Sequence, residues 1–173
     1  MWLMGAVVAA TLVSGCGGTE TVTETVTAPS TTKTGPGPPK ERVGFGHISS
    51  LTQEDGRYRM RFDPAWFLSG VTANEAAAED GAVEPGQPVP NDNYVVNEGH
   101  RLLTYVVPDT ARVTVITETG DPAQLGATTI SVAELAQLVD GTSSIELFEP
   151  LETGVWITFD VDSVTAIDQQ YKP

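Results

Sequence analysis

Few residues of this chain have the types and spacing that catalysis requires. The sequence holds two histidines, His47 and His100, and a histidine that acts as a general base needs a nucleophile beside it and an acid that orients it. Ser49 and Ser50 follow His47, yet the chain contains no Gly-x-Ser-x-Gly turn, which would expose a nucleophilic serine. We expect both histidines to be surface or turn residues. A hydrolase that uses Asp63, His100 and a nearby carboxylate is the least favoured function.

Acidic side chains gather between residues 79 and 98, where they could bind a hard cation. Calcium takes about six to eight oxygen ligands, and this segment supplies Glu79, Asp80, Glu84, Asp92, Asn93 and Glu98. Their spacing is not that of a known calcium loop. We therefore expect a solvated acidic loop, with weak binding of a divalent cation as the alternative.

Three arginines form the one basic stripe of an acidic chain. Arg57, Arg59 and Arg61 alternate with apolar residues in the stretch RYRMRF, so they share one face of a predicted strand. Arginine recognises carboxylates and phosphates through paired hydrogen bonds, which makes the stripe a candidate site for an anion such as an acidic envelope glycan. The interpretation we favour is structural, with cross-strand pairing to acids such as Asp160 or Glu118.

Aromatic residues offer a second kind of binding surface. Trp66 and Phe67 follow Asp63-Pro64, and Trp156 lies in an alternating apolar strand at residues 155–159. We expect Trp66 and Phe67 to be buried as a pair that plugs one end of a barrel. If they were exposed, they could stack on a sugar or contact a partner. The pattern around Trp156 allows both interpretations.

The single cysteine, Cys16, follows an uncharged segment at residues 2–13. That segment suits the apolar core of a secretory signal peptide and is too short for a membrane-spanning helix, which needs about 20 residues. Cys16 has neither a disulfide partner nor metal-ligating neighbours. Its place in the sequence therefore has to be explained in another way.

Residues 13–16, Val-Ser-Gly-Cys, resemble the bacterial lipobox. The resemblance implies that residues 1–15 are a signal peptide, that the thiol of Cys16 receives diacylglycerol, and that fatty acids such as palmitate are attached. Two or three acyl chains anchor a protein firmly, because each buried methylene contributes roughly 0.8 kcal/mol. The alternatives are an ordinary signal peptide with a chance cysteine and an uncleaved anchor.

A polar tether is predicted between the anchor and the folded part of the protein. Residues 16–40 comprise the lipidated cysteine and a stretch rich in threonine, proline and glycine, which cannot bury a core. As a flexible coil this stretch would span roughly 27 Å. Residues 41–173 then form a single β-rich domain on the extracytoplasmic face of the cell membrane.

The charge of the chain limits its partners. There are 23 acidic residues against 9 basic ones, which gives a net charge of −14. Nucleic acid is a poor partner because phosphate binding needs a cationic face, and anionic membrane surfaces are disfavoured for the same reason. We expect contact with the membrane through the lipid on Cys16 alone.

The alternation of apolar and polar residues predicts a protein made mainly of β-strands. Strands are expected at residues 43–51, 57–62, 94–98, 101–107, 112–118, 154–161 and 163–171. Residues 101–107 are apolar on both faces, which is typical of an interior strand. Gly44 and Gly46 in the first strand permit close backbone approach or strong bending.

Two short helices are predicted from capping boxes. In each box a hydroxyl side chain and a glutamate three residues later bond free backbone N–H groups; the boxes are Thr72–Glu75 and Ser131–Glu134, and the helices end at Gly81 and Gly141. The fold class is therefore mainly β (α+β): a small curled antiparallel sheet or open barrel of about six to seven strands with two short helices.

Four blocks of the sequence together resemble a family of uncharacterised bacterial surface lipoproteins. They are RFDPAWFLSGVTANEAAAEDG, VPNDNYVVNE, RLLTYVV and the closing GVWITFDVDSVTAIDQQYKP, with its acidic-Gln-Tyr-x-Pro tail. The resemblance covers roughly residues 43–173. It implies a compact, mostly β domain behind a lipobox and a polar tether, and it implies no particular activity.

These observations favour a lipid-anchored lipoprotein of the cell envelope with a non-catalytic binding or accessory domain. Its expected partner is an envelope protein or glycan, and no cofactor is expected. A module that binds Ca²⁺ or an anion is the alternative, and an envelope hydrolase is the least favoured one.

Overall fold

The computed structural model describes residues 41–118 and 125–171, which belong to one compact unit of the chain. The signal peptide, Cys16 and the tether predicted for residues 1–40 lie outside the described residues. The expectations for them therefore stay predictions.

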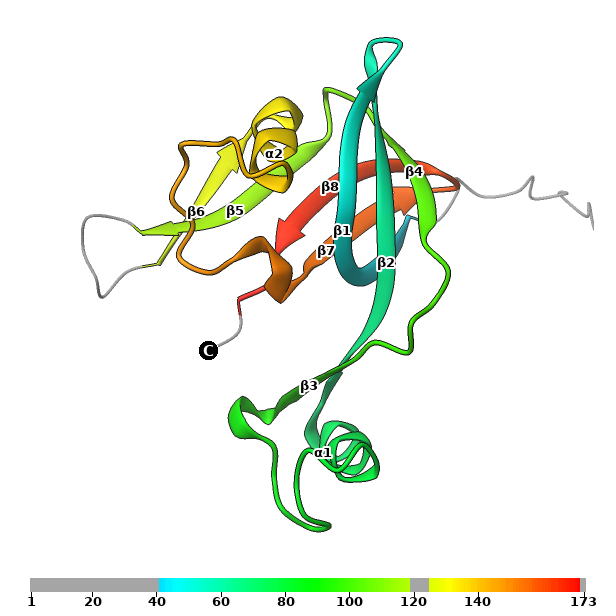
Figure 1. Ribbon diagram of the computed structural model, residues 1–173, viewed down its shortest axis with the longest axis vertical. Helices are drawn as coiled ribbons and strands as arrows, with labels where there is room; N and C mark the ends of the chain where they lie inside the picture. Colours follow the sequence, from blue (N-terminus) through cyan, green and yellow to red (C-terminus); the bar gives the residue numbers. More distant parts are fainter. Residues whose placement is uncertain (1–40, 119–124, 172–173) are drawn as a thin grey trace, which may run out of the picture. The chain divides into compact units, whose positions relative to one another are not determined.

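The described residues form eight strands and two α-helices, so the predicted mainly β class is confirmed (Figure 1). The strands are β1 (Arg42–Glu54), β2 (Arg57–Ser69), β3 (Asn93–Val96), β4 (Leu103–Val107), β5 (Arg112–Glu118), β6 (Leu125–Ile130), β7 (Val155–Asp160) and β8 (Ser163–Gln169). The helices are α1 (Gly70–Glu79) and α2 (Val132–Val139), with short 3₁₀ turns η1 (Pro90–Asp92) and η2 (Leu151–Thr153). No element had been predicted where β6 lies.

Five strands close into a barrel in the order β1-β2-β4-β8-β7 and back to β1. β4 has a neighbour on each side, as predicted for an interior strand. The strand pairs are antiparallel except at β8, which runs parallel to both β4 and β5, so the barrel is mixed. In this barrel β7, which comes late in the sequence, lies beside β1. Such a fold hosts many functions, so the function has to be argued from the site.

The main core lies inside this barrel, and the pattern of β2 shows how the sequence builds it. Tyr58, Met60 and Phe62 are buried, while the three arginines between and beside them are exposed. The predicted alternation is thus confirmed. A strand that points every second side chain inward buries apolar surface on one face and leaves the charged face in water.

Gly46 allows β1 and β2 to approach closely. A Cβ atom added at Gly46 would lie 2.2 Å from the carbonyl oxygen of Asp63 and 2.8 Å from the Phe62 ring. The close approach predicted for this segment is confirmed here. Gly44 differs, because a Cβ atom there would make ordinary contacts of 3.6 and 3.8 Å.

Helix α2 forms as its capping box predicts. The Ser131 hydroxyl accepts a hydrogen bond from the Glu134 backbone N–H at 3.2 Å, and the Glu134 carboxylate accepts one from the Ser131 N–H at 2.7 Å. Val132 and Leu135 are buried in the main core. The helix therefore docks on the barrel through these two apolar side chains.

Helix α1 begins differently from the prediction. It starts at Gly70 with Ser69 as its N-cap, and Ser69 makes no side-chain capping bond. Thr72 lies within the helix, so the predicted box of Thr72 and Glu75 is wrong. Propensity and burial, with Ala73 and Ala77 fully buried, hold this helix instead.

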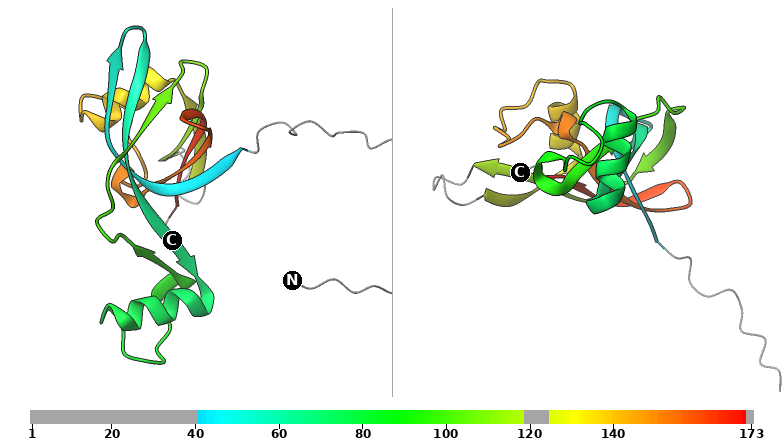
Figure 2. Two further views of the ribbon diagram at one scale, coloured as in Figure 1. Left: turned by 90° about the vertical axis from the view of Figure 1, so that its right-hand side faces the viewer. Right: turned by 90° about the horizontal axis from the view of Figure 1, so that it is seen from below.

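Helix α1 belongs to a second, smaller core beyond the end of the barrel (Figures 1 and 2). β2 is longer than predicted: it continues past Pro64 to Ser69 and pairs there with β3. Residues of α1, β2, β3 and the connecting loop meet in this core: Leu68, Ala73, Ala77, Val83, Val89 and Tyr94.

Candidate functional site

Apolar side chains from four of the five barrel strands line an open cleft of about 440 Å³, which we call the aromatic cleft. β1, β2, β4 and β7 provide its apolar lining: Val43, Phe45, Phe62, Trp66, Phe67, Leu103, Tyr105, Trp156 and Phe159. The register brings them together, because Phe45 lies opposite Ala65 on β2 and Trp156 on β7. His100, in the loop before β4, completes the wall.

Packed rings form the floor of the aromatic cleft. The ring centroids of Phe45, Phe67 and Trp156 lie between 5.1 and 5.7 Å apart in tilted or edge-to-face contacts. Tyr105 joins Phe159 at 4.9 Å. Such contacts contribute about 0.5–1.5 kcal/mol beyond burial, so the floor is a rigid surface.

The Trp156 ring is held in place by a hydrogen bond. Its indole N–H donates to the side-chain oxygen of Gln170 at 2.6 Å. Because Phe45 is buried and lies next to Trp156, the indole cannot turn away without disturbing the barrel. The sequence pattern had left the orientation of Trp156 open.

Three exposed apolar side chains surround this floor. Val43 is 63% exposed, Trp66 60% and Leu103 42%, and all three line the aromatic cleft. The expectation that Trp66 and Phe67 are buried as a pair is wrong, because β2 runs on past the barrel, where Trp66 is exposed and Phe67 is only half-buried. Clustered exposed apolar residues commonly mark a binding surface.

A few polar groups reach the aromatic cleft. Burial raises the pKa of the Tyr105 hydroxyl, and the nearby charge of Arg42 opposes that rise. The Arg42 guanidinium lies 5.5 Å from the centroid of the Phe159 ring. The cleft therefore combines ring faces with one cationic group at its margin.

The groups predicted for a hydrolase are held by other partners. The Nε2 atom of His100 lies 3.4 Å from the Glu98 carboxylate, and both side chains are exposed. One oxygen of Asp63 accepts a hydrogen bond from the Asn97 amide at 3.0 Å. The other oxygen is buried without a hydrogen-bond partner among the described residues.

The arginine stripe lies on the outer face of β2 and is not part of the aromatic cleft. Arg59 forms an ion pair of 3.0 Å with Glu54 within the β1–β2 hairpin. Arg61 donates a hydrogen bond of 3.5 Å to the Thr104 hydroxyl on β4. Arg57 is exposed and lies opposite Glu54 in the register. Anion binding by the stripe stays a prediction.

The acidic residues proposed as weak metal ligands occupy α1, η1 and the following loops. Asp80 accepts a hydrogen bond from the Tyr94 hydroxyl at 3.2 Å, and Glu98 contacts His100. Within residues 41–118 and 125–171, no three histidine, cysteine or acidic side chains group closely enough to hold a metal ion. That finding includes Glu79, Glu84 and Asp92.

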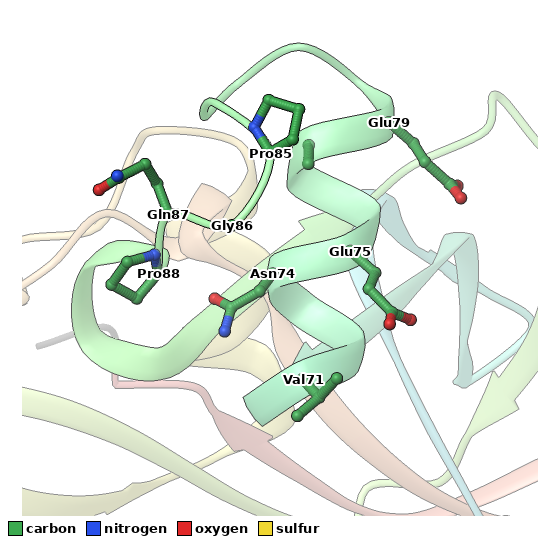
Figure 3. Close-up of a pocket in the computed structure, with 9 residues that line it drawn as sticks. Val71, Asn74, Glu75, Glu79, Pro85, Gly86, Gln87 and Pro88 are labelled. Atoms are coloured by element: carbon green, nitrogen blue, oxygen red, sulfur yellow. The ribbon is translucent and has the colours of Figure 1, made fainter.

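A second hollow, of about 610 Å³, lies between α1 and the loop at residues 85–88 (Figure 3). Figure 3 shows Asn74 turned toward this loop and Glu75 and Glu79 turned away from it. Asn74 already accepts a hydrogen bond from the Val89 N–H at 2.8 Å, so it fastens the loop. The larger hollow has fewer apolar side chains in its lining than the aromatic cleft and contains no aromatic ring.

Comparison of the chain with protein-family models, curated proteins and solved structures gave no match. None of the helices in the described part of the chain is both long enough and apolar enough to cross a bilayer. The resemblance to surface lipoproteins stays a prediction.

The sequence indicated the aromatic residues but missed their assembly into a cleft. Val43, Trp66, Leu103 and Trp156 lie on four different strands, and their meeting depends on the pairing of β1 with both β2 and β7. Only the Pro64 step gave a local signal, since proline in a strand often marks the place where regular pairing ends.

Proposed function

We propose that this protein is a lipid-anchored binding domain of the cell envelope, held outside the membrane by a lipidated Cys16, whose ligand occupies the aromatic cleft. The observation that carries the proposal is the gathering of three exposed apolar side chains, Val43, Trp66 and Leu103, around a floor of packed rings. No catalytic step is part of the proposal.

The size of the cleft favours a glycan over a protein as the ligand. Its volume of about 440 Å³ lies within the usual range for pockets that hold small molecules, about 300–1,000 Å³. A stable protein interface buries about 800 Å² on each partner, which is more than such a cleft supplies. A single sugar ring of a longer glycan can enter it and stack on Trp66 or Trp156.

The cleft is tested by titrating the full-length protein, in detergent, with a soluble neutral hexasaccharide of hexose units. We expect saturable binding, followed by tryptophan fluorescence and calorimetry, that becomes about ten-fold weaker in Trp66→Ala because one stacked ring face is lost. Val71→Ala is the matched control, since Val71 is an exposed apolar residue that lines the other hollow.

Loss of binding in Val71→Ala, or binding of neither neutral nor acidic hexasaccharides, would contradict the proposal. Binding of a peptide instead would show that the cleft serves a protein partner.

The anchor is tested separately by Cys16→Ser. We expect the wild-type protein to fractionate with membranes and to incorporate labelled palmitate, and the variant to do neither. A variant that still takes up the label and stays with membranes would show that Cys16 is not the site of lipidation.

A further inference from the structure

We infer that the ligand of the aromatic cleft is an acidic glycan, whose carboxylate binds Arg42 while its sugar ring stacks on the aromatic floor. This inference rests on the proposed function and adds the chemical class of the ligand.

Arg42 stands at the margin of the cleft. It is the first residue of β1 and lies opposite Phe159, a lining residue of the cleft, in the pairing with β7. Its guanidinium lies over the Phe159 ring, with 5.5 Å between the guanidinium carbon and the ring centroid. A guanidinium placed over a ring in this way keeps its N–H groups available for hydrogen bonds.

The charge of Arg42 is free to meet a ligand. No carboxylate of the described residues lies within ion-pair distance of it, whereas Arg59 pairs with Glu54 and Arg112 with Asp168. The neighbouring Glu41 is turned to the Thr165 hydroxyl, at 3.4 Å. In this respect Arg42 differs from Arg59 and Arg112.

The surrounding charge makes this one cation matter. In a chain of net charge −14, an anionic ligand is repelled from most of the surface. At the cleft, Arg42 offsets that repulsion, and an arginine fork can bond both oxygens of a carboxylate. Ring faces beside one cation match a hexuronic acid, which joins a sugar ring to a carboxylate.

The test compares a hexuronate hexasaccharide with the same oligosaccharide after its carboxylates have been reduced to alcohols. The reduction keeps the rings and linkages, so the difference in affinity reports the charge. We expect the acidic form to bind the full-length protein about ten-fold more tightly than the reduced form at low salt, and this ratio to fall as salt is added.

Arg42→Gln should bring the affinity for the acidic form down to that for the reduced form, and leave the latter unchanged. Arg57→Gln is the control, because it removes the same charge from the outer face of β2. We expect it to keep most of the ten-fold ratio. Melting temperatures of both variants show that the fold is retained, and Arg42→Lys should restore part of the ratio.

Equal affinity of the wild type for the two forms would overturn the inference and leave the proposed function standing. A ratio that survives Arg42→Gln but is lost in Arg57→Gln would place the anion on the arginine stripe and also overturn it. Binding of neither form would contradict the inference and the proposed function together. Tighter binding of a hexose hexasaccharide that carries a phosphate group than of the hexuronate would overturn the inference, because it would make phosphate the ligand group.

Discussion

A single buried side chain at the end of β8 bonds backbone groups of β5 and of the loop before η2. The Gln169 amide is buried; its oxygen accepts a hydrogen bond from the Ile116 N–H at 2.8 Å, and its nitrogen donates to the Glu149 carbonyl at 2.9 Å. Buried polar groups that lose a partner destabilise a fold more than the bond itself contributed. Gln169 therefore connects β8 to β5 and to the loop before η2.

Gln169→Leu should lower the free energy of unfolding by about 1–3 kcal/mol, because it leaves the Ile116 N–H and the Glu149 carbonyl, both in half-buried residues, without these partners. Urea unfolding measures this change. Gln53→Leu, at an exposed position on β1, should have an effect below about 0.5 kcal/mol. Equal effects of the two substitutions would show that the buried amide has no special role.

Gly46→Ala should destabilise the barrel by about 3 kcal/mol or more, since the new methyl group would collide with the Asp63 carbonyl. Gly44→Ala, two residues earlier, meets only ordinary contacts and should stay within about 1 kcal/mol of the wild type. Thermal unfolding of the pair checks the difference. Tolerance of alanine at position 46 would mean that β1 and β2 are not so close.

At the scale of elements, local signals succeeded where the decisive interactions are close in sequence. The alternation around Met60 and the box of Ser131 and Glu134 predicted β2 and α2 correctly. The same type of box at Thr72 was misleading, because packing of Ala73 and Ala77 against β3 and its loop starts α1 earlier. Where a helix packs against distant segments, the burial of its side chains decides its first residue more than a local capping signal does.

Two matched substitutions test this difference between the helices. Ser131→Ala removes a capping hydroxyl and should cost about 1 kcal/mol. Thr72→Ala removes a hydroxyl that caps nothing, from an exposed position inside α1, and should be neutral or slightly stabilising because alanine favours helix. Chemical unfolding compares them, and a loss in Thr72→Ala as large as that in Ser131→Ala would contradict the capping described for α1.

The cap of α2 also gives a pH dependence. Hydrogen bonds from the Ser131 backbone and hydroxyl lower the pKa of Glu134 from its usual value of 4.5. A carboxyl group whose pKa is lower in the folded state stabilises the fold above the unfolded value, and this contribution disappears as the pH falls through the folded value. The stability difference between the wild type and Glu134→Gln should thus be larger at about pH 6 than at about pH 3. Urea unfolding at both pH values measures this stability difference. An equal difference at the two pH values would contradict a lowered pKa of Glu134 in the folded state.

At the scale of the whole molecule, the cleft depends on topology that local patterns do not contain. The barrel closes because β8 returns beside β4, and β7 returns beside β1 with Trp156 opposite Phe45. The β1–β7 pairing joins Phe45 to Trp156 and the β4–β8 pairing joins Val106 to Ser163, so both link segments far apart in the sequence. The sequence could therefore predict the strands and much of the core but not which exposed residues would meet. Trp66, expected to be buried, became part of the site for the same reason.

The central claim is that the ligand lies in the aromatic cleft, and the indole N–H signals of Trp66 and Trp156 in an NMR titration with the hexuronate hexasaccharide test it most directly. Trp66→Phe and Trp156→Phe assign the two signals, and the Asn74 side-chain amide reports on the other hollow. We expect both indole signals to shift saturably while the Asn74 signal stays in place. A saturable shift of Asn74 with both indoles unmoved would contradict the account, and so would the absence of any shift.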